Sequence, residues 1–514
     1  MSIPISVGVT GHRNLRQEDL PRLRQLVRDE LQKLQKLCPD SEFIMVNSLA
    51  SGADSLCAEE ALDLGFRLVC PLPVAEVVYK QNFSPEELTV FERLRSQATE
   101  VFVAPDTEDG TPNRHFHFRQ AGLYVSDHCH VLLALWDGSE PKPGGCGTAE
   151  IVDYKRGDGR DDGFVIHIQT PRNAVPNTVP PSARLLEPET GGLEKLLKET
   201  NEFNRDCKGI TKEKALVDMP EKPNVIRSLE RCYARSAAIS GALQRKYLHT
   251  LRNIALFCVL LVVSYTLYDE GELMWMLFCY AAVLILYYCV YRRVLRGKYH
   301  ENYIRYRMLA ESLRVQTYMT AMGIHENVAC HYVWSQKQQT LWIRTAIGSL
   351  TAGKVNGSIS ADKLCATWLD SQLAYHKSAY QRNHRKDRLC SMITSAMLCC
   401  LVILFVAVLV LEYVFTAIME AQMLGIILRG WLKILWSGIS AVTLFVSSYY
   451  GQLSYSRKSD DNAAMERLFA EASQKCRSGK NDAKEVLRQL AREEIIENGN
   501  WASYCMENTP TFSL

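Results

Sequence analysis

A glycine-rich loop is the part of this sequence whose residue types best suit the binding of a phosphate. The apolar run 131–136 predicts a buried strand, and the segment 143–150, Pro-Gly-Gly-Cys-Gly-Thr-Ala-Glu, follows it. Glycines let backbone N–H groups approach an anion closely, and a helix that begins at Thr148 would direct its positive end toward the same anion. For such a loop taken alone, a turn without a ligand is the alternative.

Two further turns follow predicted strands and carry residues suited to the same ligand. The first strand, residues 3–9, runs into the turn 10–13, Thr-Gly-His-Arg. In that turn Gly11 permits an unusual backbone conformation, and the guanidinium of Arg13 could hold a phosphate or a ribose. A second strand, residues 42–46, leads into a turn of small residues that contains Ser51, Gly52 and Asp54.

Short apolar strands alternate with helical segments over the first 170 residues. Further strands are predicted at 66–70, 101–103 and 164–168, and residues 19–37 carry leucines and valines at helical spacing. This alternation predicts a doubly wound, Rossmann-like α/β domain with a parallel sheet over residues 1–170. Because ligands in such sheets bind beyond the carboxyl ends of the strands, the three loops are expected at one edge, where they would form one pocket.

The remainder of the chain has the composition of a linker followed by a membrane domain. Residues 171–192 contain four prolines between 171 and 181 and are predicted to form an extended linker. Beyond residue 193 the pattern is helical, and four apolar runs approach the roughly 20 residues that a helix needs to cross a bilayer. These predicted transmembrane helices are 253–268, 273–291, 390–411 and 431–450.

The four runs form two pairs across short loops, which favours transmembrane hairpins over buried core helices. The prediction is therefore an all-α membrane domain, with a first helical unit at 193–375 and a second at 376–514 that ends in a cytosolic helix. Between the pairs, cytosolic helices are expected with Trp334, Leu341, Trp342 and Ile343 as core. Charged residues in this region could form pairs between subunits or lie on solvated helix faces. These residues are Arg307, Glu311, Arg314 and Arg344.

Basic residues flank one side of every predicted span. The positive-inside rule then places both termini and the α/β domain in the cytoplasm of a multi-pass inner-membrane protein. The flanking residues are Arg245, Lys246, Arg252, Arg292, Arg293, Arg296, Lys298, Arg382, Arg385, Lys386, Arg388, Arg457 and Lys458. The outer loops carry five carboxylates, with Arg429 and Lys433 as partial offsets. They could form an acidic vestibule that favours cations, or ordinary solvated loops.

Four motifs of the first 170 residues, taken together, resemble the SLOG superfamily. This Rossmann-like fold is shared by DNA-processing proteins, the cytokinin-activating LOG phosphoribohydrolases and the cytosolic head of melastatin-type channels. The motifs span residues 10–13, 51–54, 135–138 and 143–150. The resemblance implies binding of a signalling nucleotide related to ADP-ribose. The ligand-binding residues expected here are Thr10, Gly11, His12, Arg13, Ser51, Gly52, Asp54, Gly144, Gly145, Gly147, Thr148 and Glu150.

The loop departs from the LOG signature at one position. LOG enzymes carry Pro-Gly-Gly-x-Gly-Thr-x-x-Glu, whose glutamate and an arginine assist cleavage of an N-glycosidic bond. In this chain Ile151 occupies the place of that glutamate, and Glu150 comes one residue earlier. Glu150 and Asp54 could each cap a helix or contact a ribose. Hydrolysis with Glu150 as the carboxylate and Arg13 as phosphate anchor therefore stays an alternative, and no catalytic residue is otherwise expected.

An internal repeat surrounds the two apolar pairs. Residues 233–237 echo 375–379 upstream of each pair, and residues 307–311 echo 467–471 downstream. The layout over 229–476 resembles a duplicated SLATT-type two-span effector. Such effectors accompany SLOG sensors and nucleotide-generating enzymes in bacterial conflict systems. The resemblance implies a membrane effector released by a nucleotide, with a nucleotide-producing enzyme acting upstream.

The residue patterns that several other functions require are absent from this sequence. There is no Walker P-loop, and no basic aromatic patch indicates nucleic acid as a partner. The 17 cysteines are scattered without zinc spacing, and His115 and His117 alone make a weak metal case, so no metal is expected. We therefore predict a nucleotide-gated channel or pore that needs no cofactor beyond its ligand, an ADP-ribose derivative or a cyclic nucleotide. It would act in a lipid bilayer as a homo-oligomer, and a tetramer is expected. The resemblance to SLOG and SLATT proteins implies a setting in bacterial antiviral defence by abortive infection. A passive membrane anchor for a partner protein is a further alternative.

Overall fold

The computed structural model describes nearly all of the 514 residues. The described ranges are 2–106, 113–157, 162–171, 179–188, 192–355, 358–414, 416–423, 426–478 and 482–508. The chain divides into two units that alternate along the sequence. The first, here called the sheet unit, comprises 1–239, 306–363 and 487–504, and the second, the hairpin unit, comprises 240–305, 364–486 and 505–514.

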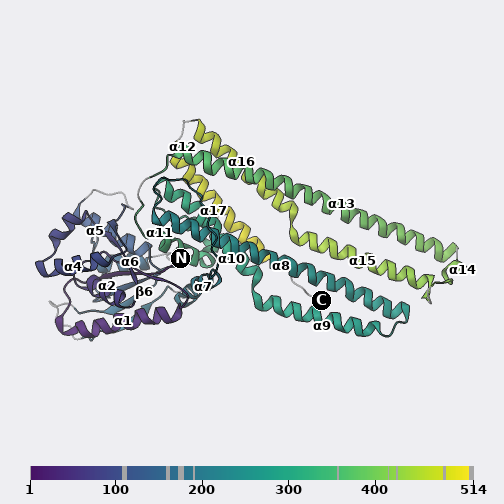
Figure 1. The fold of residues 1–514 in the computed structure, drawn as a ribbon, viewed down its shortest axis with the longest axis horizontal. Coiled ribbons are helices and arrows are strands. Elements are labelled where there is room, and N and C mark those ends of the chain that lie inside the picture. Colours follow the sequence, from purple (N-terminus) through teal and green to yellow (C-terminus); the bar gives the residue numbers. More distant parts are fainter. Residues whose placement is uncertain are drawn as a thin grey trace. The chain divides into compact units, whose positions relative to one another are not determined.

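A seven-stranded sheet organises the sheet unit (Figure 1). Its strands are β1 Ile5–Gly11, β2 Phe43–Val46, β3 Arg67–Leu72, β4 Glu100–Val103, β5 Val131–Trp136, β6 Val165–Gln169 and β7 Ala183–Leu186. The spatial order is β4-β3-β2-β1-β5-β6-β7, and only β7 is antiparallel to its neighbour. Most residues of β1, β2 and β5 are buried, as the β-branched and apolar runs of a sheet covered on both faces require. The predicted α/β fold with a mainly parallel sheet is confirmed.

Helices cover both faces of this sheet. They are α1 Leu20–Leu37, α2 Ala53–Asp63, α3 Glu76–Tyr79, α4 Pro85–Gln97, α5 Arg114–Asp127 and α6 Thr148–Arg156. The helix α2 contacts α1 and α4, whereas α5 contacts α6 over a core that includes Ala121, Val125 and Ile151. Because crossovers between parallel strands are right-handed, the connections on the β2 side and on the β5 side of β1 cover opposite faces.

The strand β7 lies within the stretch expected to be an extended linker. Its backbone pairs with β6, with Leu185 opposite Ile166. Four residues after a proline-rich segment are too few for a periodic pattern, so the sequence carried no signal for this strand. The other parts of the expected linker, 172–178 and 189–191, lie outside the described residues.

The helix α7, Leu193–Asp206, is joined to the sheet through a buried amide. The Asn204 side chain accepts a hydrogen bond from the Ile3 N–H at 2.9 Å and donates one to the Ile3 carbonyl at 2.8 Å. This amide therefore satisfies both backbone groups of a residue that is itself fully buried, as a neighbouring strand would.

The rest of the sheet unit is helical. It contains α11, Lys337–Thr351, and parts of α8, Asn224–Gly271, α10, Tyr299–Ala321, and α17, Ala483–Glu507. Trp342 and Ile343 are buried as expected, but the expectation that Trp334 belongs to the core is wrong, because its side chain is 78% exposed. It lies in a short 3-10 turn before α11, outside the buried face of that helix.

The charged residues of this region pair within the chain. Arg314 lies 2.9 Å from Glu311 and 3.5 Å from the buried Glu494 of α17. Arg307 lies over the ring of Trp501, 4.2 Å from its centroid. Pairs between subunits are therefore not needed to explain these positions.

Four long helices that contribute to the hairpin unit match the predicted spans. The apolar windows lie in helical stretches 224–271, 276–293, 362–414 and 428–477, and by length and composition each could cross a membrane. Between 0% and 28% of each window is buried inside the protein. The elements there include α9 Met276–Gly297, α13 Asp370–Val414, α14 Thr416–Met419, α15 Leu428–Leu453 and α16 Tyr455–Arg477, and α13 contacts both α15 and α16 (Figure 1). Exposed apolar helices of this length are typical of lipid-facing segments.

Ion pairs neutralise part of the loop region expected outside the membrane. Glu412 lies 2.7 Å from Arg429, and Glu270 lies 2.8 Å from Lys433. Two of the five carboxylates are thus balanced by the two basic residues of the same loops. This pairing weakens the hypothesis of an acidic vestibule.

Replacing the buried amide of α7 should destabilise the sheet unit. Asn204→Ala leaves the buried N–H and C=O of Ile3 without partners, which costs about 2 to 4 kcal/mol. We expect the melting temperature of the purified full chain to fall by several degrees in differential scanning fluorimetry. Lys198→Ala, at an exposed position of the same helix, is the control and should change little. Equal melting temperatures for the two variants would contradict this role of Asn204.

Candidate functional site

The strand order reverses at β1 and β5, the place where open α/β sheets are expected to form a ligand-binding crevice, here called the crevice between β1 and β5. These two strands are parallel neighbours, with Gly11 opposite Leu135, and their following helices lie on opposite faces of the sheet. In open α/β sheets, ligands bind at such a switch in strand order, beyond the carboxyl ends of the strands. The turn after β1 and the loop after β5 therefore lie at this switch point, and the turn after β2 follows the neighbouring strand.

Close packing at Gly11 joins the three loops. A Cβ atom at Gly11 would lie 2.3 Å from the Cβ of Ala53 and 3.0 Å from that of Leu135. The His12 N–H donates to the Leu135 carbonyl at 3.1 Å, and the His12 carbonyl accepts from the Ala53 N–H at 3.0 Å. The Nε2 atom of His12 also accepts the N–H of Asp137 at 3.1 Å. His12 therefore connects the loops, and Thr10 precedes it as part of β1.

Arg13 presents an exposed guanidinium at this edge. Its carbon lies 5.6 Å from the ring centroid of Phe118 on α5, and Arg114 lies at the same distance from that ring. No carboxylate lies within ion-pair distance of Arg13 among the residues that the structure describes. Arg13 is therefore available to an anionic ligand.

The turn after β2 is held by its own side chains. Gly52 has φ +83° and ψ −116°, and a Cβ there would lie 2.2 Å from the Arg13 carbonyl oxygen. The buried carboxylate of Asp54 accepts the Ala50 N–H at 3.3 Å, and burial raises its pKa to about 7. The Ser84 N–H donates to the Glu87 carboxylate at 2.8 Å, and this bond, together with the nearby and nearly buried Ser51 side chain, lowers the pKa of Glu87. Asp54 thus holds the turn in place.

Glu150 organises the glycine-rich loop. Its Oε1 accepts the Lys142 N–H at 2.7 Å, and its Oε2 accepts the Gly147 N–H at 3.0 Å. A Cβ at Gly145 would lie 2.1 Å from Oε1, so the carboxylate fills the space that a side chain would take. The exposed Gly144 adopts φ +71°, and α6 begins at Thr148. Of the two roles weighed for Glu150, the structure contains the cap.

The amino end of α5 completes this edge, although no sequence motif marks it. The Sγ of Cys146 lies 3.3 Å from Nδ1 of His115, which ties α5 to the glycine-rich loop. Arg114 and Arg119 stand with Arg13 near Cys146, and all three positive charges oppose the rise in its pKa that burial and Glu150 cause. Single arginines about 30 residues from the loop show no motif, so only the fold reveals the cluster.

The chemistry of this edge suits an anion. It combines three guanidinium groups with the amino ends of α5 and α6. The glycine-rich loop adds only its remaining N–H groups, because those of Lys142 and Gly147 donate to Glu150 and that of Gly145 donates to the Lys142 carbonyl. The second histidine of this segment, His117, lies 4.0 Å from Asp106. Within the described ranges, no group of three or more His, Cys, Asp or Glu side chains could hold a metal ion.

Comparison with known proteins adds no assignment. No family model matches the chain, and no curated protein matches it significantly in sequence. The resemblances to SLOG and SLATT proteins therefore rest on the motifs and the layout described above.

A side chain at Gly52 should disturb the site more than one at Gly65. Both glycines have φ above +80°, but a Cβ at Gly65 meets nothing within 4 Å. Gly65→Ala should therefore lose only about 1 kcal/mol to backbone strain, whereas Gly52→Ala also displaces Arg13 and should lose clearly more. Melting temperatures of the two full-length variants measure the difference. Equal losses would show that Gly52 does not pack closely against Arg13.

The buried carboxyl of Asp54 predicts a pH dependence of stability. Its folded pKa of about 7 exceeds the ordinary value of about 3.9, so the folded chain binds this proton more tightly than the unfolded chain. Stability should therefore fall as the pH rises from about 4 to about 7. In Asp54→Asn this contribution is absent, so its melting temperature relative to the natural chain should rise by several degrees between about pH 5 and about pH 8. Parallel curves would contradict the raised pKa.

Proposed function

We propose that this chain is a nucleotide-gated membrane effector. In this proposal the sheet unit binds a signalling nucleotide, an ADP-ribose derivative or a cyclic oligonucleotide, and the apolar helices form an ion channel or pore. The observation that carries the proposal is the convergence of Arg13, Gly52 and the glycine-rich loop at the carboxyl ends of β1 and β5. The anionic groups of a nucleotide match the guanidinium groups and backbone N–H groups of that edge.

A continuous set of contacts supports coupling from the loop to the helices of the same unit. The helix α6 begins in the glycine-rich loop and ends near the fully buried Lys155. The Nζ of Lys155 donates to the carbonyls of Ser126 and Cys129 at 2.9 Å and 3.1 Å. Asp162 lies 3.6 Å from Lys155 and 3.6 Å from Arg344 of α11. A shift of the nine-residue helix α6 would therefore act on a buried ionic link to α11.

The helices α8 and α10 each contribute residues to both units, which gives the coupling a covalent route toward the apolar helices. A ligand can drive opening only if it binds the open assembly more tightly than the closed one. Four spans per chain are too few to enclose a wide pore, which favours a homo-oligomer such as a tetramer. The basic flanks favour a cytoplasmic sheet unit and cytoplasmic termini in the inner membrane.

The proposed setting is bacterial antiviral defence, with an enzyme upstream that produces the nucleotide. It rests on the resemblance to SLOG and SLATT proteins. N-glycosidic hydrolysis with Glu150 as the carboxylate is less well supported, because both oxygens of Glu150 accept backbone hydrogen bonds that shape the loop.

Ion flux from liposomes tests the proposal. Purified full-length protein should release ions when one member of a panel of ADP-ribose derivatives and cyclic di- and trinucleotides is added. Arg13→Ala should abolish the response by removing the free guanidinium, and Gly145→Trp by filling the space of the Glu150 carboxylate. Arg22→Ala, at an exposed site on α1, is the matched control and should respond normally.

Each variant is checked for insertion into the vesicles and for its orientation there. Retained gating in both Arg13→Ala and Gly145→Trp would refute the binding site. Silence of the natural protein across the whole panel would refute nucleotide gating.

A further inference from the structure

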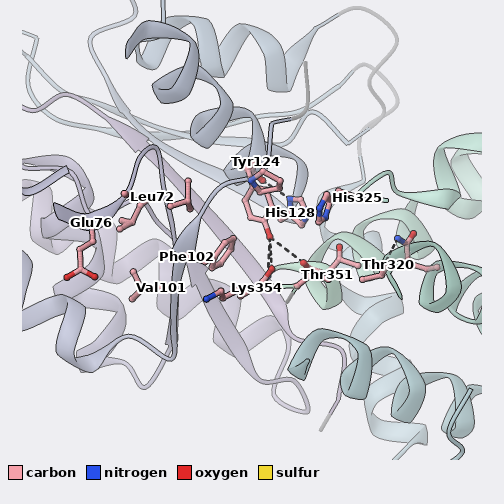
Figure 2. Close-up of a pocket in the computed structure, with 16 residues that line it drawn as sticks. Leu72, Glu76, Val101, Phe102, Tyr124, His128, Thr320, His325, Thr351 and Lys354 are labelled. Carbon is pink, nitrogen blue, oxygen red and sulfur yellow. Dashed lines mark hydrogen bonds between the residues drawn. The ribbon is translucent and has the colours of Figure 1, made fainter. Parts of the chain in front are cut away.

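A cavity lies within the sheet unit, between the edge of the sheet and the helical segments after it (Figure 2). Its volume is about 470 Å³, which falls within the range of small-molecule sites. One wall comes from β3, β4 and α5, and the other comes from α10 and from residues 351–355 after α11. None of the residues expected to bind the nucleotide lines this cavity.

The sheet wall is apolar. Leu72 and Phe102 line this wall and are buried, and the adjoining Val103, on the edge strand β4, is half exposed. The ring of Phe102 meets that of Tyr124 edge to face, with centroids 5.5 Å apart. Such a surface suits one face of a flat aromatic molecule.

Hydrogen bonds hold the opposite wall against the sheet. The Tyr124 hydroxyl accepts the Gly353 N–H at 3.0 Å and donates to the Thr351 carbonyl at 3.3 Å (Figure 2). The Lys354 N–H donates to the Glu100 carboxylate at 2.9 Å. The cavity is therefore formed before any ligand enters, which limits the ordering that binding requires.

Polar groups with unused hydrogen-bonding capacity face the cavity. The buried Thr320 hydroxyl accepts from Gln316 at 3.2 Å, and no acceptor for its own hydrogen is present among the described residues. The Nδ1 of His128 donates to the Tyr124 carbonyl at 2.8 Å, and the ring stacks on Tyr124 at 3.8 Å. Burial lowers the pKa of His128, so the neutral ring offers Nε2 as an acceptor.

A cation stands at the rim of the same cavity. No ion pair of the Lys354 ammonium is present among the described residues. The nearby Glu76 is already paired with Lys80 at 2.8 Å and with Arg95 at 3.1 Å. The rim can therefore receive an anionic group.

We propose that this cavity binds a small anionic heteroaromatic molecule of the size and polarity of a nucleoside monophosphate. Its ring would lie against the Phe102 wall, accept the Thr320 hydrogen and donate to Nε2 of His128, with its phosphate toward Lys354. Because the two walls come from the sheet and from the helices, bound ligand adds to the contact between them. This site is separate from the crevice between β1 and β5, and its existence does not depend on gating.

Binding of radiolabelled AMP and GMP to the detergent-purified full chain tests the proposal. All measurements use the Arg13→Ala background, which disables the crevice between β1 and β5. We expect saturable binding of at least one probe. Thr320→Val and Lys354→Gln should each weaken it about 5- to 10-fold, the value of one hydrogen bond or charge contact. Thr317→Val is the matched control. The Thr317 hydroxyl donates to the Leu313 carbonyl of its own helix, so this substitution should leave the affinity for the probe unchanged.

Two outcomes would overturn the proposal. If neither probe binds saturably in the Arg13→Ala background although each variant melts as the natural protein does, the assigned ligand class is wrong. If a probe binds but Thr320→Val and Lys354→Gln leave its affinity unchanged, it occupies another place. Neither outcome bears on flux through the membrane, so failure here is distinguishable from failure of nucleotide gating.

Discussion

The close packing of Gly11 against Ala53 and Leu135 is the contact on which the candidate site depends. It lets the end of β1 lie between the start of α2 and the end of β5, where any side chain would force them apart. Once these elements meet, the Arg13 carbonyl packs on Gly52 and the His12 ring accepts a bond from the loop after β5. The loop positions that face a ligand thus follow from one missing side chain and from the order of the strands.

Buried charge pairs join segments of the sheet unit at two places. Asp162 is nearly buried between Lys155 and Arg344, and Glu494 is nearly buried beside Arg314. Removing one partner of such a pair leaves an uncompensated charge, which costs more than the pair itself contributes. These contacts therefore restrict how the helices can rearrange, and a nucleotide that shifts α6 would act on one of them directly.

The sequence predicted the parts of the structure that local patterns determine. Apolar strands followed by glycine or small residues placed the turns after β1 and β2, and long uncharged runs placed the apolar helices. It could not predict contacts made by tertiary packing. Arg114 and Phe118 join the site because α5 crosses the sheet, and Trp334 is exposed because its turn precedes the buried helix. The short strand β7 and the capping role of Glu150 likewise depend on partners distant in the sequence or on exact loop geometry.

Adding the nucleotide to one side of a planar bilayer at a time is the most direct test of nucleotide gating. Purified protein is reconstituted with known orientation, and the flux-active nucleotide is added to one chamber at a time while single-channel current is recorded. Nucleotide gating predicts stepwise current only when nucleotide is in the chamber that contains the sheet unit, with reversal on washout. Current that is equal from both sides, or absent from both, would contradict a gate controlled by the crevice between β1 and β5.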